Sequence, residues 1–405
     1  MGKIYSAQTC QIWTLSADRN EYERYKNLLS KSSTVETLQS SLGTTLCCRS
    51  IEQLKSVPSV CVVHDCSEIR KPYSEQLELL GKVRSLEGST INGYRTFNSV
   101  AIGKDTLHLL DCVPFSPVSQ DFAASDAVQL GQNSNKTVAF EQISAISKAF
   151  KLANPEQIVW HLIDREADDA AYFGFIEGLG DKFVIRLKLN RNADVQFWDE
   201  EKNKEKWLKI RDKTLHNAFS RHFEKFVWKG RVHQNVKAEF SYEHMYLTGQ
   251  WVWVVKIKVL DRNGKPIFKE PMILTTNHPL TNDDLALFIY QKYLKRAKIE
   301  GVFKFLKEHL GWEDFQVRNF QAIQNLILLV FFIGAYFFEC QKDIVKDYLT
   351  QTICTIGGGK GKFTKHFFLE GILKIAHFIE VQDFIEQNDI SEHELRAFFN
   401  RQKNP

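Results

Sequence analysis

Short apolar runs alternate with helical patterns through the first half of the chain, and this alternation predicts a mixed α/β fold. Residues 59–65 and 158–164 are apolar runs that each end in an aspartate, and they predict buried strands. The segments 96–102 and 106–113 flank a Gly-Lys-Asp sequence with good turn chemistry, so they predict a β-hairpin. The predicted helices of this half are 139–154 and 165–179. Strands interleaved with helices indicate a mixed sheet flanked by helices.

The pattern changes in the second half of the chain. A β-rich block fills 189–275, and its Asn263-Gly264 dipeptide is typical of a hairpin turn. The strands predicted there are 236–247, 251–260 and 266–276. The charged run at 199–212 within this block is typical of a solvated face. The remainder of the chain has helical patterns, apart from a flexible basic loop at 357–362.

Composition narrows the class of protein. A chain of 405 residues that is 43% hydrophobic can bury at least one large core and add smaller modules. Its formal charge of +4 is too small to argue for nucleic-acid binding by itself, so a basic surface has to be local. The eight cysteines include no CxxC pair and indicate reduced thiols of a cytosolic protein, without a disulfide framework or zinc site. The most apolar stretch, 326–338, is too short to span a bilayer and predicts a buried core helix in a soluble protein.

One later segment carries an unusual polar edge. Tyr293, Arg296, Glu300 and Lys307 follow at spacings that place them within roughly 60° of one another on a helix. Two cations, a phenol and an acid on one edge suit a site that grips phosphates and a metal together. The alternative is an amphipathic helix whose charges face water. The nearby lysines that would make this the local basic patch are Lys292, Lys295, Lys298 and Lys304.

Three acids are candidates for one site. Asp65 and Asp164 each end an apolar run, which places them at the edge of a core, and Glu300 lies on the later helix. For any one aspartate, a solvated surface position is the alternative. Three carboxylates that converge would repel one another unless they are protonated or neutralised by cations. Hard oxygen ligands that are completed by substrate phosphates describe a Mg²⁺ or Mn²⁺ site. Two such ions about 4 Å apart can activate a nucleophile and stabilise the leaving oxygen of a phosphodiester.

Two motifs together resemble a known family. The spacing Tyr-x2-Arg-x3-Glu-x6-Lys at 293–307 is similar to the signature of DDE-type transposases from bacterial cut-and-paste insertion sequences. The Asp-Arg-Glu-Ala-Asp sequence at 164–168 resembles the stretch around the second catalytic aspartate of that group. The similarity extends from about 59 to 357. It implies an α/β fold with an RNase H-like mixed sheet flanked by helices, a β-rich insertion before the last catalytic helix, and helical N- and C-terminal regions.

The resemblance also implies roles for individual residues. The implied catalytic residues and metal ligands are Asp65, Asp164 and Glu300. The implied contacts to DNA phosphates are Tyr293, Arg296 and Lys307. The cofactor would be two Mg²⁺ ions, for which Mn²⁺ could substitute. The reaction would be metal-dependent cleavage at the ends of the element, with hairpin ends as an intermediate, followed by strand transfer into target DNA.

The implied partners are double-stranded DNA, both the terminal inverted repeats and the target, and a second copy of the chain in the DNA complex, without a membrane. The implied location is the bacterial cytoplasm, where the enzyme acts on the chromosome. The regions expected along the chain are a helical region with possible DNA end contact at 1–55, the catalytic core at 56–188 and 276–345, the β-rich insertion at 189–275, and a helical, possibly dimerising region at 346–405.

Other interpretations stay open at this stage. A catalytically inactive or domesticated DNA-binding derivative is the main alternative, and a general RNase H-like nuclease is another. Family members stack an extruded base on an aromatic residue of the insertion, but the alternation of Trp251 and Trp253 with valines favours a packed strand face, so neither tryptophan is assigned. The glycine-rich loop is not a phosphate-binding loop, because Phe363 stands where Ser or Thr is required.

Overall fold

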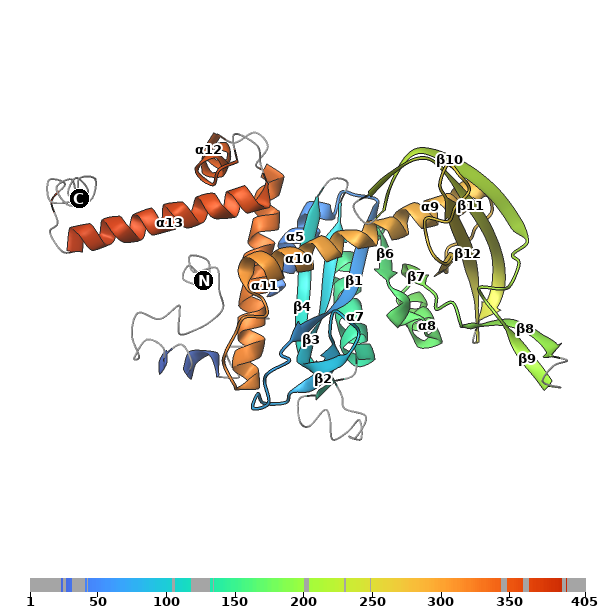
Figure 1. The fold of residues 1–405 in the computed structure, drawn as a ribbon, viewed down its shortest axis with the longest axis horizontal. Coiled ribbons are helices and arrows are strands. Elements are labelled where there is room, and N and C mark those ends of the chain that lie inside the picture. Colours follow the sequence, from blue (N-terminus) through green and yellow to red (C-terminus); the bar gives the residue numbers. More distant parts are fainter. Residues whose placement is uncertain are drawn as a thin grey trace. The chain divides into compact units, whose positions relative to one another are not determined.

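The fold is described from a computed structural model of the chain (Figure 1). The described residues are 23–24, 27–30, 41, 43–103, 106–117, 132–133, 135–199, 204–228, 231–247, 249–343, 348–359, 364–387 and 391. The chain divides into two compact units. The larger is Gln39–Phe303, and the smaller combines Met1–Leu38 with Lys304–Pro405.

The larger unit is built on one mixed sheet of eleven described strands. The strand bounds are β1 Ser59–Arg70, β2 Gly81–Arg84, β3 Thr90–Ile102, β4 Leu107–Pro117, β5 Gln132–Asn133, β6 Ile158–Ile163, β7 Lys182–Arg186, β10 Asn217–Trp228, β11 Arg231–Leu247, β12 Gln250–Leu260 and β13 Met272–Thr276. Their order is β10-β11-β12-β13-β7-β6-β1-β3-β4-β5, and β2 pairs with β3. A separate hairpin joins β8 Asn192–Asp199 to β9 Lys204–Lys209.

Five strands at the centre of this sheet form the arrangement that the sequence predicts. β1 is antiparallel to β3, and β3 is antiparallel to β4, whereas β1 runs parallel to β6 and β6 runs parallel to β7. This order, with the first strand in the middle, is that of an RNase H-like core. The predicted α/β class with a mixed sheet flanked by helices is therefore confirmed.

The helices lie on both faces of the sheet. Their bounds in the larger unit are α5 Thr44–Leu54, α7 Asn135–Ala153, η2 Arg165–Ala167, α8 Ala170–Gly178, α9 Asp283–Leu294, η3 Lys295–Ala297 and α10 Lys298–Leu310, which continues into the smaller unit. Val60 and Val62 of β1 join the apolar cluster that includes Phe150 of α7, whereas Cys61 lies 3.6 Å from Nζ of Lys292 on α9. Because successive strand residues face opposite sides, α7 and α9 cover opposite faces.

The β-rich strands continue the core sheet through β13. Leu274 pairs with Arg186, and Thr275 pairs with Ile185, so β13 links β12 to β7 by backbone hydrogen bonds. The predicted hairpin turn after β12 is present, with Gly264 at a φ of +77°. The strands β10, β11, β12 and β13 are thus part of the sheet that carries β1 and β6 (Figure 1).

A chain of buried polar side chains crosses the face of the sheet under α7. Ser99 donates to the amide oxygen of Gln142, and its hydroxyl lies 2.7 Å from Nδ1 of His64. Nε2 of His64 lies 2.8 Å from Nδ1 of His161, whose Nε2 is 3.1 Å from Asp181. Burial, with the neighbouring His161, holds the pKa of His64 well below its usual range. These contacts tie β3, β1 and β6 together, so His64 has a structural role.

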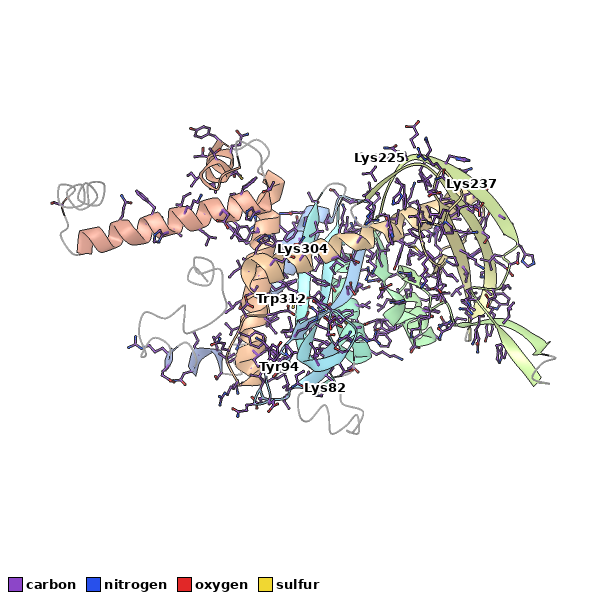
Figure 2. All side chains as sticks on the ribbon, viewed as in Figure 1. Lys82, Tyr94, Lys225, Lys237, Lys304 and Trp312 are labelled. Atoms are coloured by element: carbon purple, nitrogen blue, oxygen red, sulfur yellow. The ribbon has the colours of Figure 1, made fainter. Side chains whose placement is uncertain are left out.

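The smaller unit is helical where it is described. Its other helices are α11 Phe320–Asp343, α12 Tyr348–Ile356 and α13 Lys365–Gln387. The stretch Phe320–Phe338 is apolar and long enough to cross a membrane, but 78% of it is buried, as expected of the core helix that the sequence predicts. Trp312, labelled in Figure 2, is fully buried and donates from Nε1 to the carbonyl of Ile327 at 3.1 Å.

Some predicted segments lie partly outside the described residues. Of the helical region at 1–55, α5 is described, together with short pieces before it. In the hairpin between β3 and β4, Gly103 donates to the carbonyl of Thr106, while residues 104–105 are outside the described part. The same holds for 200–203 in the charged run and 360–362 in the basic loop. The cysteines that are described as free thiols are Cys47, Cys48, Cys61, Cys66, Cys112 and Cys354.

One glycine of the sheet leaves no space for a side chain. A Cβ atom on Gly93 of β3 would overlap the carbonyl oxygen of Ile69 and lie 2.6 Å from Cγ2 of Val83. We expect Gly93→Ala to lower the free energy of unfolding by about 1–3 kcal/mol, because the backbone oxygen cannot move aside. Gly178 of α8 has open space around the same position, so Gly178→Ala is expected to be neutral or to stabilise by up to about 1 kcal/mol. Urea denaturation measures the free energy of unfolding of both variants. Equal changes in the two variants would contradict the close packing described around Gly93.

Candidate active site

Two of the predicted acids are neighbours because their strands are parallel. The register pairs His64 with Ile163, so the next residues along β1 and β6 are Asp65 and Asp164. Asp65 alternates with the buried His64 and therefore faces the side of the sheet that α9 covers. Asp164 has extended backbone, with a φ of −78° and a ψ of 178°, and it begins the η2 turn directly after β6. Both carboxylates thus lie at one edge of the core.

The signature segment is not one continuous helix. Tyr293 lies in the last turn of α9, Arg296 lies in the 3₁₀ turn η3, and Glu300 lies in the first turn of α10. The prediction of a single helix was wrong at η3. A 3₁₀ turn rotates the chain by more per residue than an α-helix does, so it changes the directions in which the side chains on either side point.

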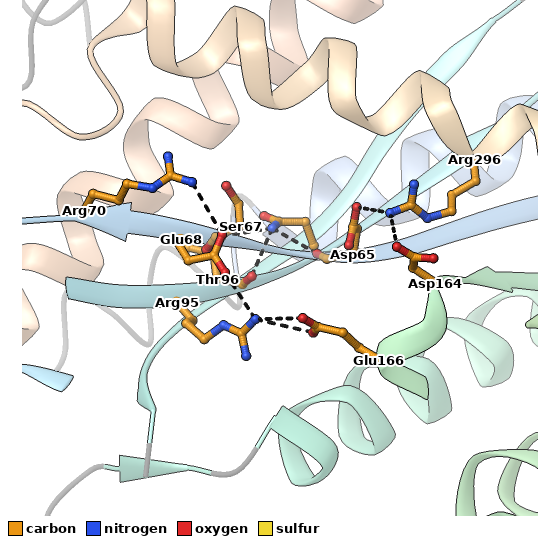
Figure 3. A network of polar contacts seen from close by, with 10 residues as sticks. Asp65, Ser67, Glu68, Arg70, Arg95, Thr96, Asp164, Glu166 and Arg296 are labelled. Carbon is orange, nitrogen blue, oxygen red and sulfur yellow. Dashed lines mark hydrogen bonds and ion pairs between the residues drawn. The ribbon is translucent and has the colours of Figure 1, made fainter. Parts of the chain in front are cut away.

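One guanidinium joins the three acids, and Figure 3 shows its contacts with Asp65 and Asp164. Nη2 of Arg296 lies 3.0 Å from Oδ2 of Asp65 and 3.2 Å from Oδ2 of Asp164. Nη1 of the same side chain lies 3.0 Å from Oε1 of Glu300. The structure therefore brings together Asp65, Asp164 and Glu300, which are separated by long stretches of sequence. Arg296, which supplies the neutralising charge, was also among the predicted site residues.

Tyr293 also contacts this cluster. Its hydroxyl donates to Oδ1 of Asp164 at 3.1 Å, and the side chain is buried. Burial raises the pKa of the Tyr293 hydroxyl, and the charge of Asp164 adds to this effect, so the phenol stays protonated and remains a donor. The Nε atom of Arg296 is buried and has no hydrogen-bond partner among the described residues. Arg296 thus keeps one unused donor inside the cluster.

The two aspartates have different electrostatic environments. Burial raises the pKa of Asp65 to about 7; Arg296 opposes the shift, and the charges of Asp164, Glu166 and Glu300 add to it. Burial also disfavours the charged form of Asp164, but Arg296 and the backbone N–H of Arg165 outweigh it and lower the pKa of Asp164. Asp65 is therefore the member of the pair that can exchange a proton near neutral pH.

The donor set is suited to a hard divalent cation. Three carboxylates that share one guanidinium keep an excess of negative charge, and hard oxygen atoms are the ligands that Mg²⁺ prefers. Within the part of the chain that is described, no three His, Cys, Asp or Glu side chains are grouped closely enough to hold a metal ion as they stand. The position of Arg296 explains this, because its two Nη atoms lie among the acids.

The turn after Asp164 is held by ion pairs that the sequence did not reveal. Arg95 of β3 lies 3.2 Å from Oε1 of Glu166, the third residue of the Asp-Arg-Glu-Ala-Asp sequence (Figure 3). The carboxylate of Asp168 accepts from the backbone N–H of Lys188 at 2.7 Å and forms an ion pair with Arg191. The alternating charges of the motif were visible in the sequence, but the distant arginine partners were not.

Asp169 ends this turn and caps the next helix. Its side chain accepts from the backbone N–H of Ala171, which is the usual role of an aspartate at a helix N-cap. The helix predicted at 165–179 is accordingly divided into η2 and α8. The prediction of one helix there was wrong because the cap requires an extended residue at 169.

The other predicted cations have varied surroundings. Lys307 belongs to the smaller unit, where it lies 3.0 Å from Glu313. Lys292 does not join a basic surface: it is buried, with Nζ 4.6 Å from the ring centres of Trp160 and Phe288. Burial lowers the pKa of Lys292. The other lysines of the expected patch, Lys295, Lys298 and Lys304, are exposed.

The two tryptophans of β12 do not form a fully packed strand face. Trp251 is 62% exposed, whereas Val252 and Val254 point into the core on the opposite side. Trp253 is half-buried and stacks on His244, with ring centres 4.8 Å apart. The expectation of a packed face was wrong for Trp251, whose exposed ring lies beside those of His244 and Tyr246 of β11, with ring centres 5.1 and 5.7 Å away.

The chain has similarity to a known protein family and to a solved structure. Residues 127–337 match the transposase DDE domain family, a range that includes Asp164 and Glu300 but begins after Asp65. The chain is also similar to a solved structure, the piggyBac transposase synaptic complex with hairpin DNA, at 9% identity and a TM-score of 0.43. That likeness covers 87% of this chain and 59% of the piggyBac chain, so this chain spans about three fifths of that protein's length. No curated protein sequence matches the chain. Because the family match extends over more than half of the sequence, the chain belongs to the transposase DDE domain family.

Proposed function

We propose that this protein is a transposase of a bacterial insertion sequence, which cleaves DNA at the ends of its element and joins the freed ends to target DNA. The observation that carries this proposal is the convergence of Asp65, Asp164 and Glu300 on the guanidinium of Arg296. Membership of the transposase DDE domain family supports the same reaction class. An acid cluster at the edge of an RNase H-like sheet, in a chain of this family, is suited to cutting phosphodiester bonds.

The metal ligands in this proposal are Asp65, Asp164 and Glu300. They would hold two Mg²⁺ ions, for which Mn²⁺ could substitute. Such ions, when bound, supply an activated nucleophile and stabilise the leaving oxygen of the phosphodiester. The excess negative charge of the cluster and the hard oxygen donors fit this role.

Arg296 and Tyr293 hold the acids in position. Arg296 binds all three carboxylates, and Tyr293 donates to Asp164, so the acids stay close despite their repulsion. The guanidinium is a two-pronged donor with the geometry to bind a DNA phosphate, and its Nε atom is still without a partner among the described side chains. Arg296 is therefore a proposed phosphate contact, and Tyr293 and Lys307 are proposed as phosphate contacts on the resemblance of the signature segment alone.

The proposed reaction has three stages. Water attacks the phosphorus at the 3′ end of the element, and the 3′ oxygen leaves. The freed 3′-hydroxyl then attacks a phosphodiester of the opposite strand and releases the 3′ oxygen of the flanking DNA, which gives a hairpin end; water then hydrolyses the hairpin and frees the 3′-hydroxyl again. The 3′-hydroxyl finally attacks a phosphodiester of target DNA. The proposed assembly is a homodimer on paired element ends, and the proposed location is the bacterial cytoplasm.

Replacing Glu300 tests the site. We expect Glu300→Ala to reduce Mg²⁺-dependent cleavage of DNA from the flanks of the coding sequence to at most about a hundredth of the wild-type rate, because one set of acidic oxygens is lost. DNA binding, measured by fluorescence anisotropy, should change little, because an acid contributes nothing favourable to phosphate binding.

Glu308→Ala is the matched control, because Glu308 is an exposed acid on the same helix and pairs with Lys304. It should cleave at the wild-type rate. Cleavage by Glu300→Ala at the wild-type rate would overturn the site. A wild-type protein that binds these DNA ends and never cleaves them would favour the alternative, an inactive DNA-binding derivative.

The raised pKa of Asp65 gives a pH dependence with a definite sign. The pKa of Asp65 is about 7 in the folded protein and about 4 in the unfolded chain, so the folded protein binds more protons than the unfolded chain between these two pH values. In a chelator, the free energy of unfolding should therefore fall as pH rises from about 4 to about 7. The free energy of unfolding of Asp65→Asn, measured relative to that of wild type, should rise by about 1–3 kcal/mol between about pH 5 and about pH 8.

Urea denaturation at several pH values measures this difference. Asp284→Asn is the control, because Asp284 is an exposed carboxyl on α9. The difference in free energy of unfolding between Asp284→Asn and wild type should not change over this pH range. The apparent affinity for Mg²⁺ should rise with pH through about 7, since the proton on Asp65 competes with the cation. Identical pH curves for the two variants would contradict the assignment.

A further inference from the structure

Two adjoining hollows extend from the acid cluster along the β7 side of the sheet. The first has a volume of about 840 Å³ and is lined by Asp65 and Asp164, together with Arg165, Lys188 and Arg186. The second has a volume of about 600 Å³ and lies between β13, the segment before it and the facing ends of β10 and β11. Arg186 and Glu270 line both hollows. The hollows therefore form a path that leads from the acids to the β10–β11 hairpin.

Five cations along this path have no ion-pair partner in the described part of the chain, whereas Arg211, which also lines the first hollow, pairs with Asp212. The positively charged side chains in question are Arg165, Arg186, Lys188, Arg231 and Lys269. None of them has a carboxylate within 4 Å among the described residues, which include Glu270. By contrast, Lys213 and Arg221 on nearby elements each pair with an acid at 3.0 Å. Unpaired cations gathered in a hollow present an unneutralised positive field to an anionic ligand.

The far hollow also has an apolar wall. Trp228 of β10 meets Phe268 edge to face, with ring centres 4.5 Å apart, and both side chains line the hollow beside Arg231 and Lys269. Cations that alternate with aromatic side chains in a groove are typical of sites for single-stranded nucleic acid, because one strand presents both its phosphates and its base faces. A duplex presents only its phosphates to such a groove and leaves the aromatic wall without a partner.

We propose that this groove, from Lys188 past Arg186 to Arg231 and Lys269, binds a single DNA strand as it leaves the acid cluster. The inference rests on the proposed function, because it takes DNA as the substrate of the acids. Phosphates lie against the cations, and the strand passes over Trp228 and Phe268. Glu270 lies at the junction of the two hollows and narrows the path between them.

The test compares a short blunt duplex with the same duplex that carries an unpaired oligo-dT extension, on either strand. Fluorescence anisotropy in a chelator measures binding without cleavage. Wild-type protein should bind one extended duplex roughly tenfold more tightly than the blunt one. The double variant Arg231→Gln/Lys269→Gln should lose this gain, and its salt dependence on the extended duplex should flatten by about 1.4, the value for two phosphate contacts to a single strand. Lys188→Gln, at the other end of the groove, should lose part of the gain.

Arg262→Gln/Lys265→Gln is the matched control, because both residues are exposed in the turn after β12 and line neither hollow. It should keep the full gain. A double groove variant that keeps the gain would overturn the proposal, and so would wild-type protein with no gain from either extension. Wild-type protein that shows the gain but never cleaves DNA would overturn the proposed function and support the groove. Wild-type protein that cleaves without the gain would overturn the groove alone.

Discussion

The mutual repulsion of three carboxylates is the constraint around which the candidate site is organised. Asp65 lies within β1, Asp164 directly follows β6 and Glu300 lies on a distant helix, and the three would move apart from one another without a cation. Arg296 supplies that cation from a 3₁₀ turn between two helices and contacts all three acids at 3.0–3.2 Å. Burial raises the pKa of Asp65 to about 7, and the neighbouring acids add to the shift because this one side chain cannot balance three negative charges. The same imbalance makes the cluster attractive to a further cation.

The sheet sets the spacing of these acids through its pairing register. β1 and β6 are parallel and adjacent, so consecutive residues beyond their paired stretch lie side by side at the same edge. On the opposite face, His64, one residue before Asp65, contacts His161, three residues before Asp164, and joins the same two strands. A shift of one residue in β1 would exchange the buried His64 for Asp65 and would place a carboxylate among the buried side chains under α7. The register and the site therefore depend on each other.

Much of this arrangement could be predicted from the sequence, because the relevant patterns are local. Apolar runs that end in an acid located Asp65 and Asp164 at the edge of the core, and the spacing of four polar residues located Arg296 and Glu300 in one segment. The expected strand end at Asp65 was wrong, because β1 continues to Arg70 through its pairing with β3. The parts that could not be predicted depend on contacts between distant residues. Arg95 meets Glu166, and Lys292 is buried between Trp160 and Phe288, although nothing near Lys292 in the sequence distinguishes it from exposed lysines. The 3₁₀ turn η3 was also missed, since a change of helix type leaves little trace in the periodicity of three residues.

The short strand β13 has a mechanical consequence. Its five residues pair with β12 on one side, and Leu274 and Thr275 pair with β7 on the other, so backbone pairing joins the long β10–β12 ribbon to the strands beside the acids. A load applied at the far end of the ribbon is transmitted through backbone hydrogen bonds to β7 and then to β6, instead of being absorbed by a linker. A segment bound by the ribbon is therefore held at a fixed distance and direction from Asp164.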